Sequence, residues 1–548
     1  MNKIIKICKN LYAFIIIVAG LIICSSSVGF STFTLIAFGF YLSLYLLLLA
    51  ISRKQTFSLV ITSSIIILIQ LINQIKVHFY KERLFFSDFY VACDINNLST
   101  LLHYPLALFY LVCLFAFIII NALLFRKGKK IKNKTRLWAL LFSLLTFVII
   151  IYLSGQKDLN KRWQSYLPKG RGTISNLLVS AHQLSYEPPF YETSSDYFLQ
   201  KMSAITADLP QTKQQQKPDI VVFLQESTFN PQLFNFESNH LPNFEMFKQN
   251  NSNLMRVQTY GGGTWLSEFS MLTGLNSDDF QSRKNSVFYV VAPHIKTSLF
   301  NELNNNGYNT IVFSPMQFGN YNAGPAYTAL GMQQFLTPQD LGYPAEKTKN
   351  LWKIPSEHLL KQVKELLETK SDKPRFIFVL SMFEHGPYSQ DTPDHYNLAQ
   401  DVNDGHFVGQ LNDYLAKLQP LNKATLDFIN YINERNNPTL FLYFGDHQPA
   451  VSWNGNYKTD LPNGYYLTQY TLASNYPINI EKNEVTDISL VGSLVLEKAG
   501  VNYSDFYKAN IAMRYLCNGM LDDCKDEKLV SSYKHYIYQD LGIAGETQ

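Results

Sequence analysis

Five long apolar stretches fill the first 154 residues of the chain, and none of them contains Asp, Glu, Lys or Arg. Each is about as long as a helix must be to cross a bilayer. They cover residues 11–29, 33–51, 57–75, 105–125 and 137–153. The pattern predicts a transmembrane domain of five helices in residues 1–154. The first stretch alone would suit a cleaved signal peptide, but the four further spans favour a permanent anchor.

Beyond residue 217 the pattern changes to short apolar runs that alternate with helical segments. Runs rich in β-branched and aromatic residues, typical of buried strands, cover Asp219–Leu224, Thr310–Phe313, Phe376–Leu380 and Thr439–Phe444. Segments with helical spacing, such as Pro355–Leu367 and Leu411–Arg435, lie between these runs. This alternation predicts an α/β domain with a mainly parallel central sheet sandwiched by helices.

The domain organisation follows from these two patterns. Residues 155–217 are expected to be a linker, because they end in the polar run Gln211–Lys217, which has no apolar periodicity. Residues 218–500 are expected to form the α/β domain. Residues 501–548 are expected to form a small C-terminal subdomain.

Basic residues cluster before the first span, between the second and third, and between the fourth and fifth. These clusters are Lys3, Lys6 and Lys9; Arg53 and Lys54; and Arg126, Lys127, Lys129, Lys130, Lys132, Lys134 and Arg136. With five spans, all three clusters lie on one side, which the positive-inside rule makes cytoplasmic. We therefore expect a multi-pass protein of the bacterial inner (cell) membrane. Its large domain after Ser154 would be periplasmic or extracytoplasmic.

The charge balance agrees with this division. Residues 1–154 carry a net charge of +12, so the whole-chain value of +4 leaves −8 for the remainder. The large domain therefore has no cationic field that would attract a polyanion. Nucleic-acid binding is excluded on this ground.

Four polar side chains follow predicted strands or a glycine-rich turn. Glu226 follows the first strand, Thr264 follows three glycines at the start of a helical segment, and Asp446 and His447 follow the last strand. The carboxyl ends of parallel strands share one edge of a sheet, where ligands bind. Oxygen and nitrogen ligands together suit one divalent metal ion, Mn²⁺ or Zn²⁺. A metal ion beside the Thr264 hydroxyl would also activate it as a nucleophile.

A fifth candidate, His385, ends the strand-like segment at Phe376 and precedes a Gly-Pro turn. There it is placed to donate a proton to a leaving group. Each candidate also has a structural alternative. Glu226 and Thr264 suit helix caps, His385 suits a core position, and the Asp446–His447 pair suits the closing of a turn.

In this order along the chain, the motifs resemble the alkaline phosphatase and sulfatase superfamily. They are most similar to its membrane-anchored lipoteichoic acid synthases and phosphoglycerol transferases. The resemblance implies that Glu226, Thr264, Asp446 and His447 bind the metal, that Thr264 is the nucleophile, and that His385 contacts substrate. It also implies transfer of phosphoglycerol from a phospholipid donor to a glycan or lipid acceptor through a phosphothreonine intermediate.

Three alternative functions remain. The first is a phosphoethanolamine transferase, with phosphatidylethanolamine instead of phosphatidylglycerol as donor, although Gln225-Glu226-Ser227 departs from the Gly-Glu-Thr of those enzymes. The second is a sulfatase-like phosphodiesterase or sulfuric ester hydrolase, although no cysteine begins the sulfatase nucleophile motif. The third is a non-enzymatic envelope sensor.

One segment departs from the lipoteichoic acid synthases. Where those enzymes carry Trp and Arg, this chain aligns Tyr321 and Ala323. The change removes a bidentate phosphate contact. The donor or the acceptor is therefore expected to differ from theirs.

Two cysteines, Cys517 and Cys524, are the only ones in the large domain. Because an oxidising periplasm favours disulfides, we predict that these two form a local disulfide. Such a bond would favour a Gram-negative envelope.

Overall fold

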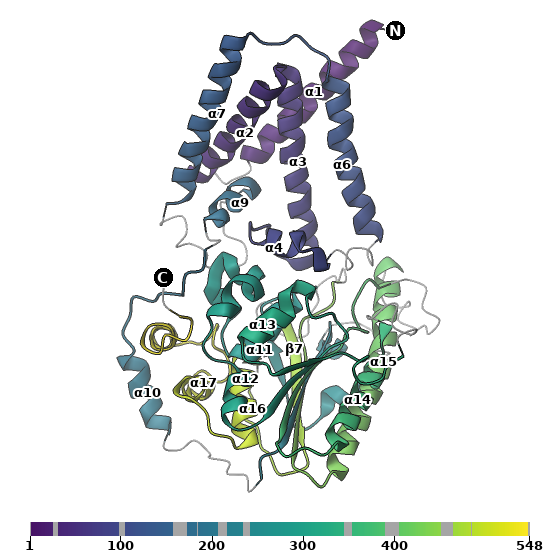
Figure 1. The fold of residues 1–548 in the computed structure, drawn as a ribbon, viewed down its shortest axis with the longest axis vertical. Helices are drawn as coiled ribbons and strands as arrows, with labels where there is room; N and C mark the ends of the chain where they lie inside the picture. Colours follow the sequence, from purple (N-terminus) through teal and green to yellow (C-terminus); the bar gives the residue numbers. More distant parts are fainter. Residues whose placement is uncertain are drawn as a thin grey trace. The chain divides into compact units, whose positions relative to one another are not determined.

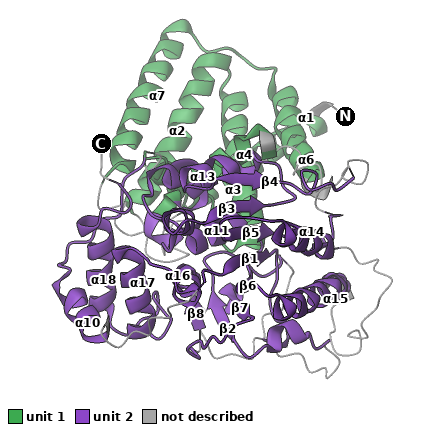
Figure 2. Cartoon of the chain, turned by 60° about the horizontal axis from the view of Figure 1, so that its bottom comes forward, with its two compact units in different colours: residues 1–185, 281–283 green, residues 186–280, 284–548 purple. Residues whose placement is uncertain are grey.

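The computed structural model describes residues 2–25, 31–97, 105–156, 172–182, 185–206, 216–233, 242–344, 353–388, 405–450, 464–483 and 485–545. The chain divides into two compact units (Figure 2). Unit 1 comprises Met1–Ser185 and Gln281–Arg283, and unit 2 comprises Tyr186–Phe280 and Lys284–Gln548.

Unit 1 is built from long apolar helices. Five helices in the described residues are long and apolar enough to cross a membrane, as predicted. They are α1 (Asn2–Ser25), α2 (Thr32–Ser52), α3 (Gln55–Tyr80), α6 (Pro105–Phe125) and α7 (Asn133–Ser154). The shorter α-helices among the described residues of this unit are α4 (Asp88–Cys93) and α9 (Thr173–Ala181).

Small side chains allow the helices of unit 1 to approach one another. A Cβ on Gly20 of α1 would lie 2.8 Å from the Cβ of Ser63 in α3. Between α2 and α7, Ser43 Oγ donates to Ser143 O at 3.0 Å and Ser143 Oγ donates to Ser43 O at 2.8 Å. Close backbone contact and interhelical hydrogen bonds are typical of membrane helix packing.

The described part of unit 2 contains one sheet of eight strands in the order β4-β3-β5-β1-β6-β7-β2-β8. The strands are β1 (Asp219–Gln225), β2 (Ser252–Arg256), β3 (Asn309–Phe313), β4 (Gln334–Leu336), β5 (Arg375–Leu380), β6 (Thr439–Gly445), β7 (Leu467–Ser474) and β8 (Val485–Asp487). All pairs are parallel except those that β7 makes with β6 and β2. The predicted mainly parallel sheet is confirmed.

Helices cover both faces of this sheet (Figure 1). One face carries α14 (Ser356–Glu368) and α15 (Gly405–Glu434), and the other carries α11 (Thr264–Thr273), α12 (Leu299–Asn305) and α16 (Ile488–Ala499). The remaining helices of the unit are α10 (Asp196–Thr206), α13 (Ala323–Ala329), α17 (Asp505–Leu516) and α18 (Glu527–His535). In α14 the buried residues Leu359, Val363 and Leu367 recur every four positions, as expected for a helix with one face on a sheet.

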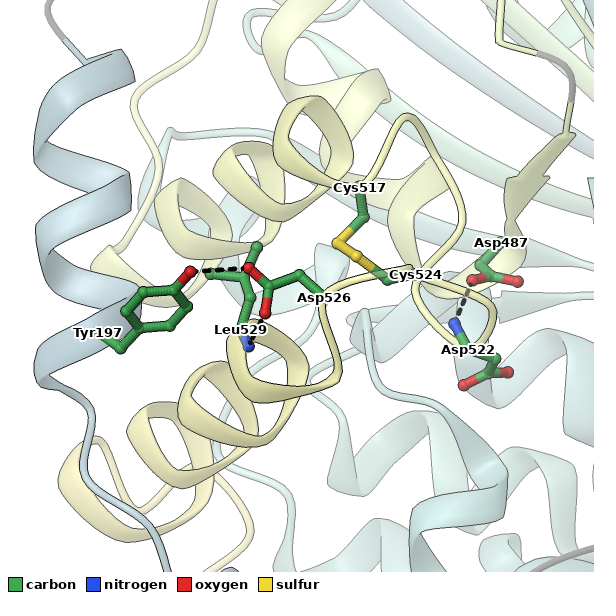
Figure 3. Close-up of a disulfide and its surroundings, with 7 residues drawn as sticks. All are labelled: Tyr197, Asp487, Cys517, Asp522, Cys524, Asp526 and Leu529. Carbon is green, nitrogen blue, oxygen red and sulfur yellow. Dashed lines mark hydrogen bonds between the residues drawn. A yellow bond between two sulfur atoms is a disulfide. The ribbon is translucent and has the colours of Figure 1, made fainter.

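The segment between the two predicted domains contains α9 and α10. Residues 157–171 and 207–215 of this segment, including most of the polar run Gln211–Lys217, lie outside the described residues. Near the C-terminus, Cys517 and Cys524 form a disulfide (Figure 3), which confirms the predicted pairing.

Candidate active site

The two central strands β1 and β6 end side by side. Gln225 pairs with Gly445 in the parallel register, so the next residues, Glu226 and Asp446, emerge at the same edge of the sheet. A Cβ on Gly445 would lie 1.6 Å from the carbonyl oxygen of Thr228. Only glycine therefore allows the turn after β1 to pass so close to the end of β6.

Glu226, Asp446 and His447 converge at this edge. One ligand atom from each lies within 4.8 Å of the others, and all three side chains are buried. His447 Nε2 is 3.5 Å from Glu226 Oε1 and 3.3 Å from Asp446 Oδ2. His447 Nδ1 lies 2.9 Å from the carbonyl of Gln448. An Nδ1–H donated to that carbonyl leaves the Nε2 lone pair directed at the two carboxylates.

The two oxygens of Asp446 have different surroundings. Oδ1 accepts the backbone N–H of Ser227 at 2.7 Å and that of His447 at 2.8 Å. Oδ2 has no hydrogen-bond partner among the described residues, although the side chain is fully buried. A buried carboxylate oxygen without a partner is costly, and a cation would satisfy it. The donor set of two carboxylates and one imidazole therefore fits a single divalent metal ion.

Thr264 is the first residue of α11 and follows Gly263, whose φ is +80°. Its Oγ1 donates to Glu226 Oε2 at 3.0 Å and lies 3.5 Å from His447 Nε2. The hydroxyl thus faces the carboxylate cluster, and the N-cap position of α11 is held by Gly263, not by Thr264. It is half-buried, and the N-terminus of α11 provides free N–H groups for an anion beside it.

His385 completes the set of predicted residues. Its Nε2 lies 3.8 Å from Glu226 Oε1, and its side chain is 22% exposed. Its backbone carbonyl accepts a hydrogen bond from Lys417 Nζ at 3.0 Å. The structure therefore brings Glu226, Thr264, His385, Asp446 and His447 into one site.

The electrostatics of the site follow from burial. Burial would raise the pKa of Glu226, but the nearby His385 and His447 outweigh it and lower that pKa. Burial, together with the charge of Glu226, raises the pKa of Asp446 well above its ordinary value. Burial lowers the pKa of His447, which keeps this imidazole neutral and able to bind a cation at neutral pH.

Two further buried carboxyl groups, Glu268 and Glu384, were not among the predicted site residues. Burial raises the pKa of each to about 7. Glu384 accepts hydrogen bonds from Ser356 Oγ at 2.8 Å and Ser381 Oγ at 2.7 Å. Ser381 Oγ in turn accepts the backbone N–H of Glu226 at 3.0 Å. The adjacency of Glu384 to His385 was the one signal in the sequence that would have singled it out.

Glu268 lies one helical turn after Thr264 and accepts a hydrogen bond from Tyr321 OH at 2.9 Å and another from Tyr327 OH. Tyr321 has a left-handed backbone with φ of +37°, and its ring centre lies 5.7 Å from that of Trp265. Ala323, which aligns with an arginine of the lipoteichoic acid synthases, is buried at the start of α13. This segment therefore contributes aromatic rings beside the helix of Thr264.

Comparison with known proteins places this site in a family. The sulfatase family model matches residues 218–480, which include all five predicted site residues. The structure of the Streptococcus pyogenes phosphoglycerol transferase GacH, in complex with sn-glycerol-1-phosphate, superposes with a TM-score of 0.52 at 20% sequence identity, over 66% of this chain and all of that chain. The chain contains a sulfatase-family domain.

The structural likeness to known proteins extends into unit 1. The integral membrane lipooligosaccharide phosphoethanolamine transferase A of Neisseria meningitidis has the same overall fold, with a TM-score of 0.50 at 14% identity over 87% of this chain and 98% of that chain. An uncharacterized protein of Haemophilus influenzae is 35% identical over 91% of this chain and 93% of its own length. Proteins of this fold thus include a phosphoglycerol transferase and an integral membrane phosphoethanolamine transferase. The match to the sulfatase family supports an enzyme of that family.

Proposed function

We propose that this protein is a membrane-bound, metal-dependent phosphotransferase of the bacterial inner (cell) membrane. It moves a phosphoglycerol group from a phospholipid such as phosphatidylglycerol to an envelope glycan or lipid, through a phosphothreonine intermediate on Thr264. The observation that carries this proposal is the hydrogen bond from Thr264 Oγ1 to Glu226 Oε2, beside the unpartnered Asp446 Oδ2. A hydroxyl held against a buried carboxylate cluster at a helix N-terminus suits attack on phosphorus.

Each residue of the site has a role in this reaction. Glu226, Thr264, Asp446 and His447 would hold one divalent metal ion, Mn²⁺ or Zn²⁺. When bound, such an ion stabilises the alkoxide of the nucleophile and polarises the phosphoryl oxygen. Glu226 accepts the hydrogen bond from the Thr264 hydroxyl. This bond orients the lone pair of Thr264 Oγ1 toward the phosphorus of the donor. The free N–H groups at the start of α11 stabilise charge on the phosphoryl oxygens.

The transfer takes place in two displacements. Thr264 Oγ1 passes its proton to Glu226 and bonds to the phosphorus of the donor, and the bond from phosphorus to the diacylglycerol oxygen breaks. His385 donates a proton to that departing oxygen. An acceptor hydroxyl then passes its proton to His385 and bonds to the same phosphorus. The bond to Thr264 Oγ1 breaks, and the proton on Glu226 returns to Thr264. Confinement of a lipid donor to the plane of the anchored enzyme raises its effective concentration.

The second candidate is transfer of phosphoethanolamine from phosphatidylethanolamine. The buried Ala323, at the position where lipoteichoic acid synthases carry an arginine, leaves this alternative open, because it removes one phosphate contact of those enzymes. Leu224-Gln225-Glu226-Ser227 favours phosphoglycerol, because it departs from the Gly-Glu-Thr of phosphoethanolamine enzymes. GacH is a phosphoglycerol transferase and the Neisseria protein is a phosphoethanolamine transferase, so structural neighbours exist for both headgroups.

Trapping the intermediate tests the proposal and separates the donors. The full-length protein in lipid nanodiscs is incubated with Mn²⁺ or Zn²⁺ and either headgroup-labelled phosphatidylglycerol or headgroup-labelled phosphatidylethanolamine. We expect mass spectrometry to find phosphoglycerol on Thr264, and neither a Thr264→Ala variant nor metal-chelated enzyme to carry it. Thr264→Ser, which keeps the hydroxyl, is expected to retain labelling. Label only from phosphatidylethanolamine would reassign the donor, and label from neither lipid would refute the mechanism.

A further inference from the structure

The C-terminal end of α11, the helix that begins with Thr264, is held by buried side chains of α17. Tyr507 OH donates to the carbonyl of Leu272 at 3.3 Å, and Asn510 Nδ2 donates to that of Gly274 at 3.0 Å. Both side chains are fully buried. The last carbonyls of a helix lack partners within it, so these bonds fasten α11 to α17.

A second link joins the chain just after α11 to the disulfide hairpin, which we define as Cys517–Cys524. Asn276 Nδ2 lies 2.6 and 2.7 Å from the two carboxylate oxygens of Asp522. Asn276 Oδ1 accepts the backbone N–H of Asp278 at 2.9 Å. Asn276 is 2% exposed, whereas Asp522 is exposed. The carboxylate of Asp522, on the hairpin, therefore accepts hydrogen bonds from the buried amide of Asn276.

The disulfide hairpin is itself fixed to the edge strand β8. Asp522 N donates to Asp487 Oδ2 at 2.9 Å (Figure 3), and the carbonyl of Gly519 accepts the N–H of Asp487 at 2.7 Å. Gly519 has φ of +83°, and a Cβ there would lie 2.6 Å from the carbonyl oxygen of Val485. Because Cys517 follows α17 directly, the disulfide closes the hairpin onto the helix that holds α11.

Helix α11 is also in close contact with α16, which follows β8. A Cβ on Gly492 would lie 2.6 Å from the carbonyl oxygen of Met271. The ten residues of α11 span about 15 Å as a continuous hydrogen-bonded rod. A displacement at its C-terminal end is therefore carried to Thr264 at its other end.

We propose that the Asn276–Asp522 pair and the Cys517–Cys524 disulfide position Thr264 for phosphoryl transfer. The effect of these residues on phosphoryl transfer rests on the proposed function. Their effect on the position of α11 does not. In the described part of the chain, neither Asn276 nor Asp522 makes a hydrogen bond with a predicted metal ligand, and both act through α11. Loss of the pair moves Thr264 Oγ1 relative to Glu226 Oε2, which lie 3.0 Å apart.

Charge-swap variants of the full-length protein test the pair. Asn276→Asp places a buried carboxylate against Asp522, so we expect faster hydrogen–deuterium exchange in the first turn of α11. We also expect single-turnover labelling of Thr264 to slow by about tenfold, because small misplacements of reacting groups are costly, with the KM for donor lipid little changed. Combining Asn276→Asp with Asp522→Asn restores an amide–carboxylate pair, so both measurements should recover.

Two further variants sharpen the test. Asp523→Asn removes a charge from the neighbouring hairpin residue, which pairs with Arg256 at 3.0 Å, and is expected to leave both measurements unchanged. Cys517→Ser combined with Cys524→Ser opens the hairpin and should reproduce the effect of Asn276→Asp. Faster exchange confined to the hairpin, or no recovery in the swapped pair, would overturn the proposal. If the parent enzyme never labels Thr264, the phosphotransferase function fails, and the exchange data still decide the positioning role.

Discussion

At the scale of single residues, the sequence predicted the position of Asp446 in the site but not the contacts of its side chain. Its position after an apolar run, next to His447, predicted a ligand at the sheet edge, and the structure brings both beside Glu226. The roles of its two oxygens could not be predicted, because Oδ1 is bound by the turn at Ser227, 219 residues away in the sequence. The roles of Glu226, Asp446 and His447 as metal ligands remain predictions.

Glu384 was missed for the same physical reason. Its partners Ser356 and Ser381 make a buried carboxyl tolerable, and one of them comes from a separate helix. No local pattern distinguishes such a glutamate from an exposed one at a strand end. Glu268 depends in the same way on Tyr321 and Tyr327.

The raised pKa of Glu384 gives a test by pH. Burial raises this pKa from 4.5 to about 7, so between these values the folded protein binds a proton that the unfolded chain releases. The group therefore makes the free energy of unfolding fall as pH rises from about 4.5 to about 7, by up to roughly 3 kcal/mol. As pH rises from 5 to 7.5, we expect the thermal stability of Glu384→Gln to fall less than that of the parent, as measured by thermal unfolding in detergent. The exposed Glu365→Gln is the control, and equal losses in all three proteins would contradict the assignment.

At the scale of elements, continuous apolar runs predicted β1, β3, β5 and β6, because these strands are buried on both faces. The antiparallel strand β7 was not predicted. It carries Thr468, Gln469 and Thr471 in buried positions, and Gln469 is buried because its amide donates to the carbonyl of Phe247 at 2.6 Å. A strand in which distant segments satisfy polar side chains such as Gln469 and Thr471 shows neither an apolar run nor alternation.

The close approach of the turn after β1 to the end of β6 gives a prediction at this scale. Gly445→Ala places a methyl group 1.6 Å from the carbonyl oxygen of Thr228, so the two strand ends must separate. We expect a loss of about 3 kcal/mol or more in stability and loss of bound metal, measured by thermal unfolding and by elemental analysis of the purified protein. Gly128→Ala, where nothing lies within 4 Å of the new Cβ, should change neither. Retention of a full metal complement in Gly445→Ala would show that the strand ends need not be so close.

At the scale of the whole molecule, composition alone predicted the main division. Apolar length predicted the five helices that the described residues of unit 1 contain, and the asymmetry of basic residues predicted their orientation. The disulfide between Cys517 and Cys524 agrees with an extracytoplasmic unit 2, because such bonds persist in oxidising compartments. The helices α9 and α10 were not predicted, because helices of 9 and 11 residues are too short for their periodicity to stand out in the sequence.

Thiol labelling tests the orientation. Cys93, the last residue of α4, is exposed. Gly128 lies in the basic connector between α6 and α7. In spheroplasts, a membrane-impermeant maleimide is expected to label Cys93 and to spare the thiol of a Gly128→Cys variant until the cells are lysed. The reverse pattern would invert the topology and place unit 2 in the cytoplasm.

The uneven exposure of the five site residues bears on the order of events. Glu226, Asp446 and His447 are sealed from solvent, whereas Thr264 and His385 are partly open. Under the proposed function, the phosphorus atom is therefore approached from one side only, and the two substrates must take turns in a shared entrance. Diacylglycerol has to depart before an acceptor can enter, so the kinetics would be of the ping-pong type, with each substrate in excess inhibiting the other.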